Sequence, residues 1–330
     1  MHSCSTKRTD PGVHEDVSMQ RTIRSMAEVR RGVAERVVGR VRETDLLLAA
    51  IGAGRDVLLE GPPGTSKSTL LGAITAELGS PLMFVEGNAD LTPARLVGYH
   101  DPARVLSEGY HEDNFVPGPL VAAMHDGGVL YLEEFNRSPE DTLNSLLTAM
   151  AERRITVPRV GTVVADPAFR VVASMNPFDN IGTVRLSMSV HDRFCRLSVG
   201  YQDTQAEHEI VVRRTGCGSA RLVADAVALT RATREHPDLR GGSSVRGAID
   251  LTLVAMQLFD MRGVADDLPD STDPPRDLPA EYTGAVLDAL LVALSGRIAV
   301  DEVSETTPEA VLREIWQDHF LLRPAAAAPG

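Results

Sequence analysis

The pattern of apolar and polar positions in the first two thirds of the chain predicts strands that alternate with helices. Apolar residues recur at helical spacing from Met26 to Ala53, with a break at Val38-Gly39-Arg40. Short apolar runs bounded by turn residues are typical of buried strands, and they occur at 56–60, 81–86, 128–133 and 169–174. Helical segments at 68–78 and 141–152 lie between them. This alternation predicts a parallel, doubly wound α/β sheet flanked by helices.

The pattern changes beyond Val199. Residues 203–235, 245–262 and 281–298 have helical periodicity, and no convincing strand is predicted beyond Val199. The segment 263–280 is rich in Asp and Pro and is expected to be a mobile acidic loop, whereas residues 1–20 are polar and expected to be a disordered tail. We therefore predict an α/β domain at 21–201 and a small all-α lid domain at 202–330.

Composition and charge narrow the possible partners and location. The 330 residues are 43% hydrophobic and 24% charged, which excludes wholesale disorder, and the net charge of −13 argues against a general grip on nucleic acid. Three scattered cysteines, Cys4, Cys195 and Cys217, favour a reducing cytoplasm over a disulfide framework. No signal peptide or membrane span is expected. These features predict a soluble cytoplasmic protein with no nucleic-acid partner and no membrane insertion.

The turn Gly61-Pro-Pro-Gly64-Thr-Ser66-Lys67-Ser68 lies between a predicted strand and a predicted helix, as a phosphate-binding loop does. Backbone N–H groups of such a loop point at phosphate oxygens. Lys67 would neutralise the β- and γ-phosphates, and the Ser68 hydroxyl would bind Mg²⁺. Ser66 stands where a glycine normally precedes the lysine. The alternative is an ordinary Gly/Pro turn that precedes Lys-Ser by chance.

The segment Gly128-Val-Leu-Tyr-Leu-Glu133-Glu134 places two carboxylates at the C-terminal edge of the predicted sheet, beside the phosphate loop. In a P-loop NTPase the first acid helps to hold Mg²⁺ and the second polarises the attacking water. The first acid is usually an aspartate, and the extra methylene of Glu133 shifts its carboxylate outward. An acidic strand end that faces solvent is the alternative interpretation.

A third polar group follows the strand predicted at 169–174, in Ala173-Ser-Met-Asn176-Pro177. The uncharged amide of Asn176 beside Glu134 would orient the attacking water without competing for charge. Asn-Pro alone is a routine turn signal. This motif indicates a functional site only because it follows the loop and the acidic strand in that order.

Together these motifs resemble an AAA+ ATPase, and within that class the MoxR family, over about residues 37–297. The resemblance rests on Val38-Gly39-Arg40, the phosphate loop and Glu133-Glu134-Phe-Asn136-Arg137. Further motifs are similar to the family's: Phe115-Val-Pro-Gly118 after a helix-2 insert at about 90–114, a sensor 1 region at Asn176-Pro177 and Gly182-Thr183, Asp192-Arg193-Phe194, and Gly242 to Ala248, where Val245 replaces the usual proline.

This resemblance implies an AAA+ P-loop NTPase fold followed by a helical lid, with ATP and Mg²⁺ as cofactors. It implies a ring, hexameric in such families, in which Arg193 reaches the γ-phosphate of the adjacent subunit and Arg246 senses it within the same subunit. Glu134, Asn176, Arg193 and Lys67 are the expected catalytic residues, and Ser68 and Glu133 the expected metal ligands. The residues expected at the nucleotide are Val38, Gly39, Gly61, Pro62, Pro63, Gly64, Thr65, Ser66, Lys67, Ser68, Thr69 and Arg246.

The resemblance also implies partners. Family members are similar to chaperone-like remodellers that act on a protein with a von Willebrand factor A domain, which here would be a separate chain. One alternative is the motor subunit of a metal-chelatase or gas-vesicle assembly, and another is a nucleotide-switch scaffold that hydrolyses little because Glu133 misplaces Mg²⁺. A nucleic-acid motor is disfavoured by the acidic net charge.

Overall fold

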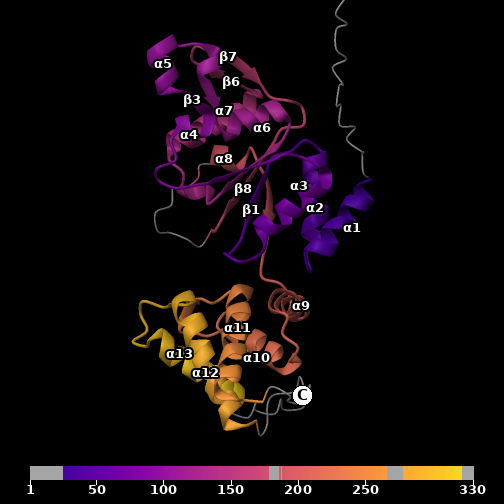
Figure 1. Ribbon diagram of the computed structural model, residues 1–330, viewed down its shortest axis with the longest axis vertical. Helices are drawn as coiled ribbons and strands as arrows, with labels where there is room; N and C mark the ends of the chain where they lie inside the picture. Colours follow the sequence, from indigo (N-terminus) through magenta and orange to yellow (C-terminus); the bar gives the residue numbers. More distant parts are fainter. Residues whose placement is uncertain (1–24, 178–185, 187, 266–277, 322–330) are drawn as a thin grey trace, which may run out of the picture.

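The computed structural model describes residues 25–177, 186, 188–265 and 278–321 (Figure 1). Three sequence predictions fall outside this range: the disordered tail at 1–20, Gly182-Thr183 of the expected sensor 1 region, and most of the acidic loop at 263–280. Within the described residues, no helix combines the length and the apolar character that crossing a membrane requires.

A five-stranded parallel sheet forms the centre of the α/β part. Its strand order is β2 (Leu82–Glu86), β5 (Val129–Glu133), β8 (Arg170–Met175), β1 (Val57–Glu60) and β9 (Cys195–Ser198). The four strands expected from the sequence are confirmed within a residue or two. The sequence did not predict β9, because Arg196 and Ser198 interrupt its apolar run and only one of its four residues is buried.

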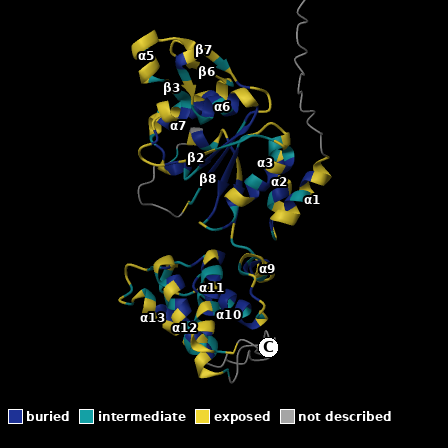
Figure 2. Cartoon of the chain, viewed as in Figure 1, coloured by how far each residue is buried: buried dark blue, intermediate teal, exposed yellow. Residues whose placement is uncertain are grey.

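Successive residues of β1 face opposite sides of the sheet, as the pleat requires. Val57 and Leu59 pack with α1 (Met26–Arg36), α2 (Val41–Gly52) and α3 (Lys67–Leu78), whereas Leu58 packs with α4 (Pro93–Val97), α6 (Pro119–Asp126) and α7 (Glu140–Glu152). The central strands β1, β5 and β8 are therefore buried on both faces, which explains their nearly continuous apolar runs (Figure 2).

Two antiparallel strand pairs, which the sequence did not predict, lie beside the helices α4, α6 and α7. They pair β3 (Gly98–His100) with β4 (Phe115–Pro117), and β6 (Arg154–Val157) with β7 (Gly161–Val164). The strands are short and mostly exposed, so they lack an apolar signal. The remaining short elements here are α5 (Pro102–Glu108), η1 (Glu112–Asn114), η2 (Phe135–Arg137) and α8 (Met188–His191).

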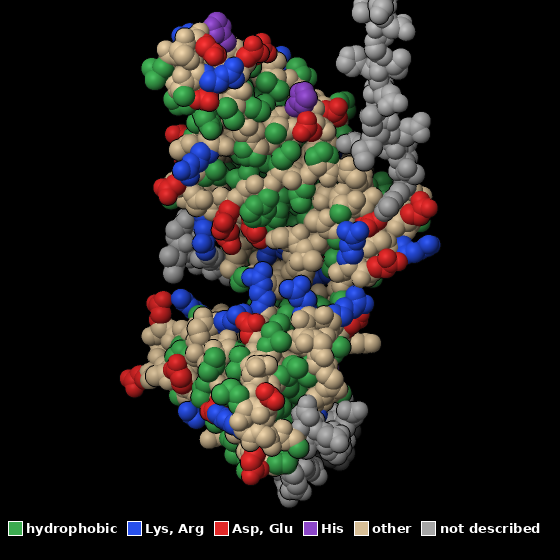
Figure 3. All heavy atoms as spheres, in the orientation of Figure 1, with side chains coloured by type: hydrophobic (Ala, Val, Ile, Leu, Met, Phe, Trp, Pro, Cys, Tyr) green, Lys and Arg blue, Asp and Glu red, His purple; other side chains and the backbone are tan. Residues whose placement is uncertain are grey.

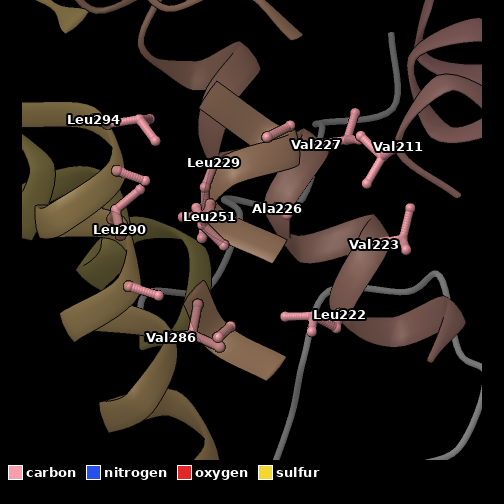
Figure 4. Packing of buried hydrophobic residues seen from close by; sticks show 14 of the residues in the cluster. Val211, Leu222, Val223, Ala226, Val227, Leu229, Leu251, Val286, Leu290 and Leu294 are labelled. Atoms are coloured by element: carbon pink, nitrogen blue, oxygen red, sulfur yellow. The ribbon is translucent and has the colours of Figure 1, made fainter. Parts of the chain in front are cut away.

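The helices beyond Gly200 form a bundle with an apolar cluster of its own (Figures 1 and 4). They are α9 (Thr204–Thr215), α10 (Ala220–Ala232), α11 (Val245–Arg262), α12 (Ala280–Leu294) and α13 (Pro308–Phe320), with η3 (Ser295–Arg297) between the last two. The cluster includes Leu222, Leu251 and Leu290, each fully buried. We call α9–α13 the helical bundle; the exact domain boundary near residue 201 stays a prediction.

Two sequence predictions about this region are wrong in detail. The helical stretch expected at 203–235 is interrupted, because Gly216 (φ +67°) ends α9 and Ser219 caps α10 with its side chain. The expectation of no strand is also wrong, since β10 (Leu239–Gly241) pairs with β11 (Ala299–Val300). These strands are too short to leave a period-two pattern.

Candidate nucleotide site

The loop between β1 and α3 has the backbone of a phosphate-binding turn. Gly64 has φ +73° and Ser66, which precedes the first residue of α3, has φ +66°. A glycine takes this left-handed region freely, but in serine it costs about 1–2 kcal/mol. The serine at the usual glycine position is thus accommodated, with strain, and the N–H groups at the start of α3 remain available to an anion.

Lys67 is buried at the start of α3 and turns its ammonium group toward its own loop. Its Nζ donates to the carbonyl oxygens of Gly61 and Pro62, both at 2.9 Å. Burial lowers the pKa of Lys67, and the nearby Glu133 and Glu134 carboxylates oppose this effect. The ammonium group therefore lies between the loop and the two acids that the sequence singled out.

Hydroxyl groups connect the loop to the acidic strand. Ser68 Oγ donates to Glu133 Oε1 over 2.7 Å and lies 3.1 Å from the Tyr131 hydroxyl. The same phenol oxygen lies 2.9 Å from Ser174 Oγ on β8 and 3.4 Å from Glu133 Oε1. Burial is the main cause that raises the pKa of Tyr131 to about 12, so the phenol stays protonated. The expected metal pair, Ser68 and Glu133, is in direct contact.

Glu134 begins the turn after β5 with φ +51°, a strained value for a glutamate. Its Oε2 is buried and lies 3.3 Å from Arg137 Nε, an ion pair without hydrogen-bond geometry. Glu134 and Asn176, which lies just beyond β8, line one cavity. The structure therefore brings the expected water-activating acid and the expected orienting amide to one edge of the sheet.

Two adjoining cavities lie along the loop, in the crevice where Figure 3 shows Lys and Arg side chains gathered between the sheet and the helical bundle. The first, of about 340 Å³, is lined by the loop together with Glu133, Glu134, Asn176 and Arg246. The second, of about 280 Å³, is lined by the aliphatic side chains of Val37, Val38, Ile210, Val245 and Ile249, and also by Arg36, Gln202, Arg213 and Arg214. Both share Gly64, Ser66, Thr69 and Arg246, so they form one elongated site: one part holds Lys67 and the two acids, and the other has aliphatic and basic walls.

Of the two arginines predicted to act on phosphate, the structure brings one to the site. Arg246, on the first turn of α11, borders both cavities. Arg193 follows α8 and is exposed, and it is not among the residues that line either cavity. Arg193 is therefore a surface residue outside both cavities of its own chain.

Arg40 has a role that the sequence did not reveal. It is 4% exposed, pairs with Glu43 at 2.7 Å, and donates to the carbonyls of Thr65 (3.0 Å) and Gly200 (2.7 Å). It thereby connects the phosphate loop to the segment that leads into the helical bundle. Val38-Gly39-Arg40 was noted as a motif, but only the fold shows that the arginine reaches the loop.

A second arginine joins the same junction to the helix that carries Arg246. Arg234 lies 4.1 Å over the ring of Tyr201, pairs with the buried Glu207 at 2.8 Å, and donates to the carbonyl of Ser243 at 2.7 Å. Ser243 precedes the cap of α11. The start of α11, and with it Arg246, is thus fixed against the segment that enters the bundle.

Comparison with known proteins agrees with the fold class. Residues 56–194 match the family model of the AAA domain (dynein-related subfamily), and they contain the loop, the acidic strand and the Asn176 strand. The predicted fold class, a parallel α/β sheet flanked by helices and followed by a helical part, is confirmed, and its residues 56–194 resemble an AAA domain.

Individual proteins resemble the chain only at low sequence identity. The chain is 27% identical over 232 residues to an uncharacterised protein of Staphylococcus epidermidis, covering 68% of this chain and 88% of that protein. It is 27% identical over 246 residues to an uncharacterised protein of Staphylococcus aureus, covering 71% and 90%. Among solved structures, the RuvB Holliday junction branch migration motor of Thermotoga maritima matches with 17% identity and a TM-score of 0.47, over 79% of this chain and 72% of that one.

Proposed function

We propose that this protein is a MoxR-like AAA+ ATPase, which binds Mg²⁺-ATP in the elongated site and hydrolyses it. One observation carries the proposal: the Ser68 hydroxyl and the Glu133 carboxylate meet at 2.7 Å beside Lys67, in a cavity that continues into a second one with aliphatic and basic walls. This order of groups suits a triphosphate beside Lys67 and a base against the aliphatic wall of the second cavity.

The oxygen donors present fit a magnesium ion that arrives with the nucleotide. Among the described residues there is no group of three or more His, Cys, Asp or Glu side chains that could hold a metal on its own. Mg²⁺ binds through one or two protein oxygens together with substrate phosphates, and Ser68 and Glu133 supply such oxygens. When bound, the ion would neutralise charge that develops on the β- and γ-phosphates.

The chain's own residues would then share the remaining work. Lys67 would exchange its loop carbonyls for phosphate oxygens, and the N–H groups at the start of α3 would bind the same anion. Glu134 would accept the proton of the attacking water, and Asn176 would orient that water. Gly61 to Thr65 would wrap the phosphates, while Val38 and Gly39 would contact the base.

The proposal includes assembly into a ring, with Arg193 as the residue that completes the neighbour's site. Its exposure and its absence from the lining of both cavities of its own chain support a role across a subunit interface. A guanidinium keeps its charge at all working pH values and can stabilise charge on a transferring phosphoryl group. Arg246 would act on the same phosphate from α11 of its own chain. We propose six subunits, by resemblance to the MoxR family.

The proposed task of the ring is chaperone-like remodelling of a client, through a separate protein with a von Willebrand factor A domain. This part rests on the resemblance of the motifs alone. A nucleotide switch with little hydrolysis is the second candidate, and it depends on Glu133 misplacing Mg²⁺. The 2.7 Å contact with Ser68 favours the ATPase, since the longer side chain still reaches the residue with which it would share the metal.

The test is ATP turnover per subunit, measured over a wide range of protein concentration with Mg²⁺ present. An ATPase with shared sites gives a specific activity that rises with concentration and then levels off. Nucleotide binding without turnover at any concentration would favour the switch, and the absence of nucleotide binding would overturn both.

A further inference from the structure

Tyr131 is an unusual residue for the place it occupies. It lies on β5, two residues before Glu133, and is 1% exposed in a strand whose other buried members are aliphatic. A buried phenol needs a hydrogen-bond partner, and this one has three oxygens within 3.4 Å. These belong to Ser68 of the loop, Glu133 of its own strand and Ser174 of the neighbouring strand β8.

Counting the available protons shows which group donates in each of these contacts. The Glu133 carboxylate can only accept, and it takes the single hydroxyl proton of Ser68. At the 3.1 Å contact between Ser68 and Tyr131 the phenol must therefore be the donor, and it shares the same proton with Glu133 Oε1 at 3.4 Å. The proton of Tyr131 is then committed to the metal pair, so Ser174 must donate at the 2.9 Å contact.

We propose that Tyr131 is a positioning residue for the divalent cation bound with the nucleotide. Its proton orients the Ser68 hydroxyl, so that this hydroxyl donates to Glu133 and keeps a lone pair for the cation. Glu133 Oε1 is held from the same side, whereas Glu133 Oε2 has no hydrogen bond within the described part of the chain. The inference rests on the proposed function, because it assigns Tyr131 a task at the Mg²⁺-ATP site.

The need for such a residue follows from the length of Glu133. A glutamate has one more rotatable bond than an aspartate, so more conformations must be excluded before its carboxylate can bind a metal. Tyr131 is rigidly packed between the sheet and α3, in the cluster that contains Leu70 and Ile74. A fixed phenol is therefore well placed to restrict the mobile side chain.

The experiment compares Tyr131→Phe with the wild-type chain and with Tyr282→Phe. Tyr282 is a matched control, since it is also fully buried and donates to a carboxylate, that of Asp225, at 2.9 Å in the helical bundle. The probe is a fluorescent ATP analogue. Its affinity is measured first without divalent metal and then as Mg²⁺ or Mn²⁺ is titrated, and Mn²⁺ binding is followed by electron paramagnetic resonance.

Tyr131→Phe should leave the affinity without metal unchanged, which also shows that the variant folds. The concentration of Mg²⁺ or Mn²⁺ at the midpoint should rise about fivefold to tenfold, as expected for one lost hydrogen bond to a charged network. Tyr282→Phe should keep the wild-type midpoint. Equal midpoints in Tyr131→Phe and the wild type, or equal shifts in the two variants, would overturn the inference.

A different result would mark failure of the proposed function itself. If the wild-type chain does not bind the analogue, or binds it with no response to either metal, the Mg²⁺-ATP site is absent. The role of Tyr131 then falls together with that site.

Discussion

Gly64 of the phosphate loop lies directly against Ser244, the residue that caps α11. A Cβ placed on Gly64 would lie 2.2 Å from Ser244 Oγ, and the glycine has φ +73°. The loop and the helical bundle therefore meet at a point where no side chain fits. Because Arg246 follows two residues after Ser244, a displacement here would move an arginine that borders both cavities.

Gly64→Ala should therefore weaken nucleotide binding by more than tenfold, since the new methyl group both strains the loop and pushes α11 away. The measurement is titration with a fluorescent ATP analogue. Gly72→Ala is the control, because Gly72 lies in α3 with no atom within 4 Å of the added Cβ. That variant should bind normally and gain up to about 1 kcal/mol of stability. Normal binding by Gly64→Ala would show that the phosphate loop and the helical bundle separate freely.

Lys67→Met should make the nucleotide-free protein more stable while abolishing nucleotide binding. The pKa of Lys67 is lowered by burial, so the folded protein disfavours the charged form relative to the unfolded chain. Removing that charge should raise the melting temperature, by roughly 2–4 °C for each kcal/mol gained. Thermal melts with and without ATP provide the measurement, and a melting temperature that falls in the absence of nucleotide would contradict the prediction.

The lowered pKa of Lys67 also makes the free energy of unfolding depend on pH. Between the lowered pKa and the ordinary lysine pKa of 10.5, the unfolded chain binds more protons at Lys67 than the folded one. The free energy of unfolding therefore rises with pH over this interval, and the penalty is fully present below it. The stability difference between Lys67→Met and the wild type should thus shrink as the pH is raised from neutrality to about 10. A constant difference would show that the ammonium group is well solvated.

Arg40→Ala should destabilise the protein by about 2–4 kcal/mol, because it removes a buried guanidinium that pairs with Glu43 and satisfies two backbone carbonyls. It should also weaken nucleotide binding, since one of those carbonyls belongs to Thr65 of the loop. Urea unfolding and analogue titration measure the two effects. Arg42→Ala, two residues away and exposed, should stay within about 0.5 kcal/mol of the wild type.

The contrast between these residues shows how far the sequence could be interpreted. The loop and the acidic strand were predictable because their signals are local: a strand, a turn of small residues, and charges at fixed spacing. The contacts of Arg40 were not, since Gly200 lies 160 residues away and only the pairing of β9 with β1 brings it near. The hydrogen bonds of Tyr131 were not predictable either. In the sequence it is one more residue of a buried strand, and the partners of its hydroxyl group are known only from the fold.

Glu134→Gln should bind Mg²⁺-ATP with nearly wild-type affinity and hydrolyse it about 10²–10⁴ times more slowly, as expected when a general base is lost. The amide keeps the shape of the side chain but cannot accept a proton from water. Single-turnover assays separate the chemical step from binding. Glu140→Gln, which changes an exposed carboxylate at the start of α7, is the control. Hydrolysis by Glu134→Gln at the wild-type rate would show that another group activates the water.

The proposal that Arg193 acts on the neighbouring subunit can be tested by mixing two inactive variants. Arg193→Ala keeps an intact loop but lacks the arginine for its neighbour, whereas Lys67→Ala keeps the arginine but cannot hold nucleotide. In a mixed ring, an intact loop of the first variant can face an intact Arg193 of the second, so part of the ATP turnover should return. An arginine that acts within its own chain would give no recovery on mixing, and neither would a protein that stays monomeric; sedimentation of the mixture distinguishes these two cases. Arg313→Ala, an exposed arginine on α13, should keep full turnover alone and in mixtures.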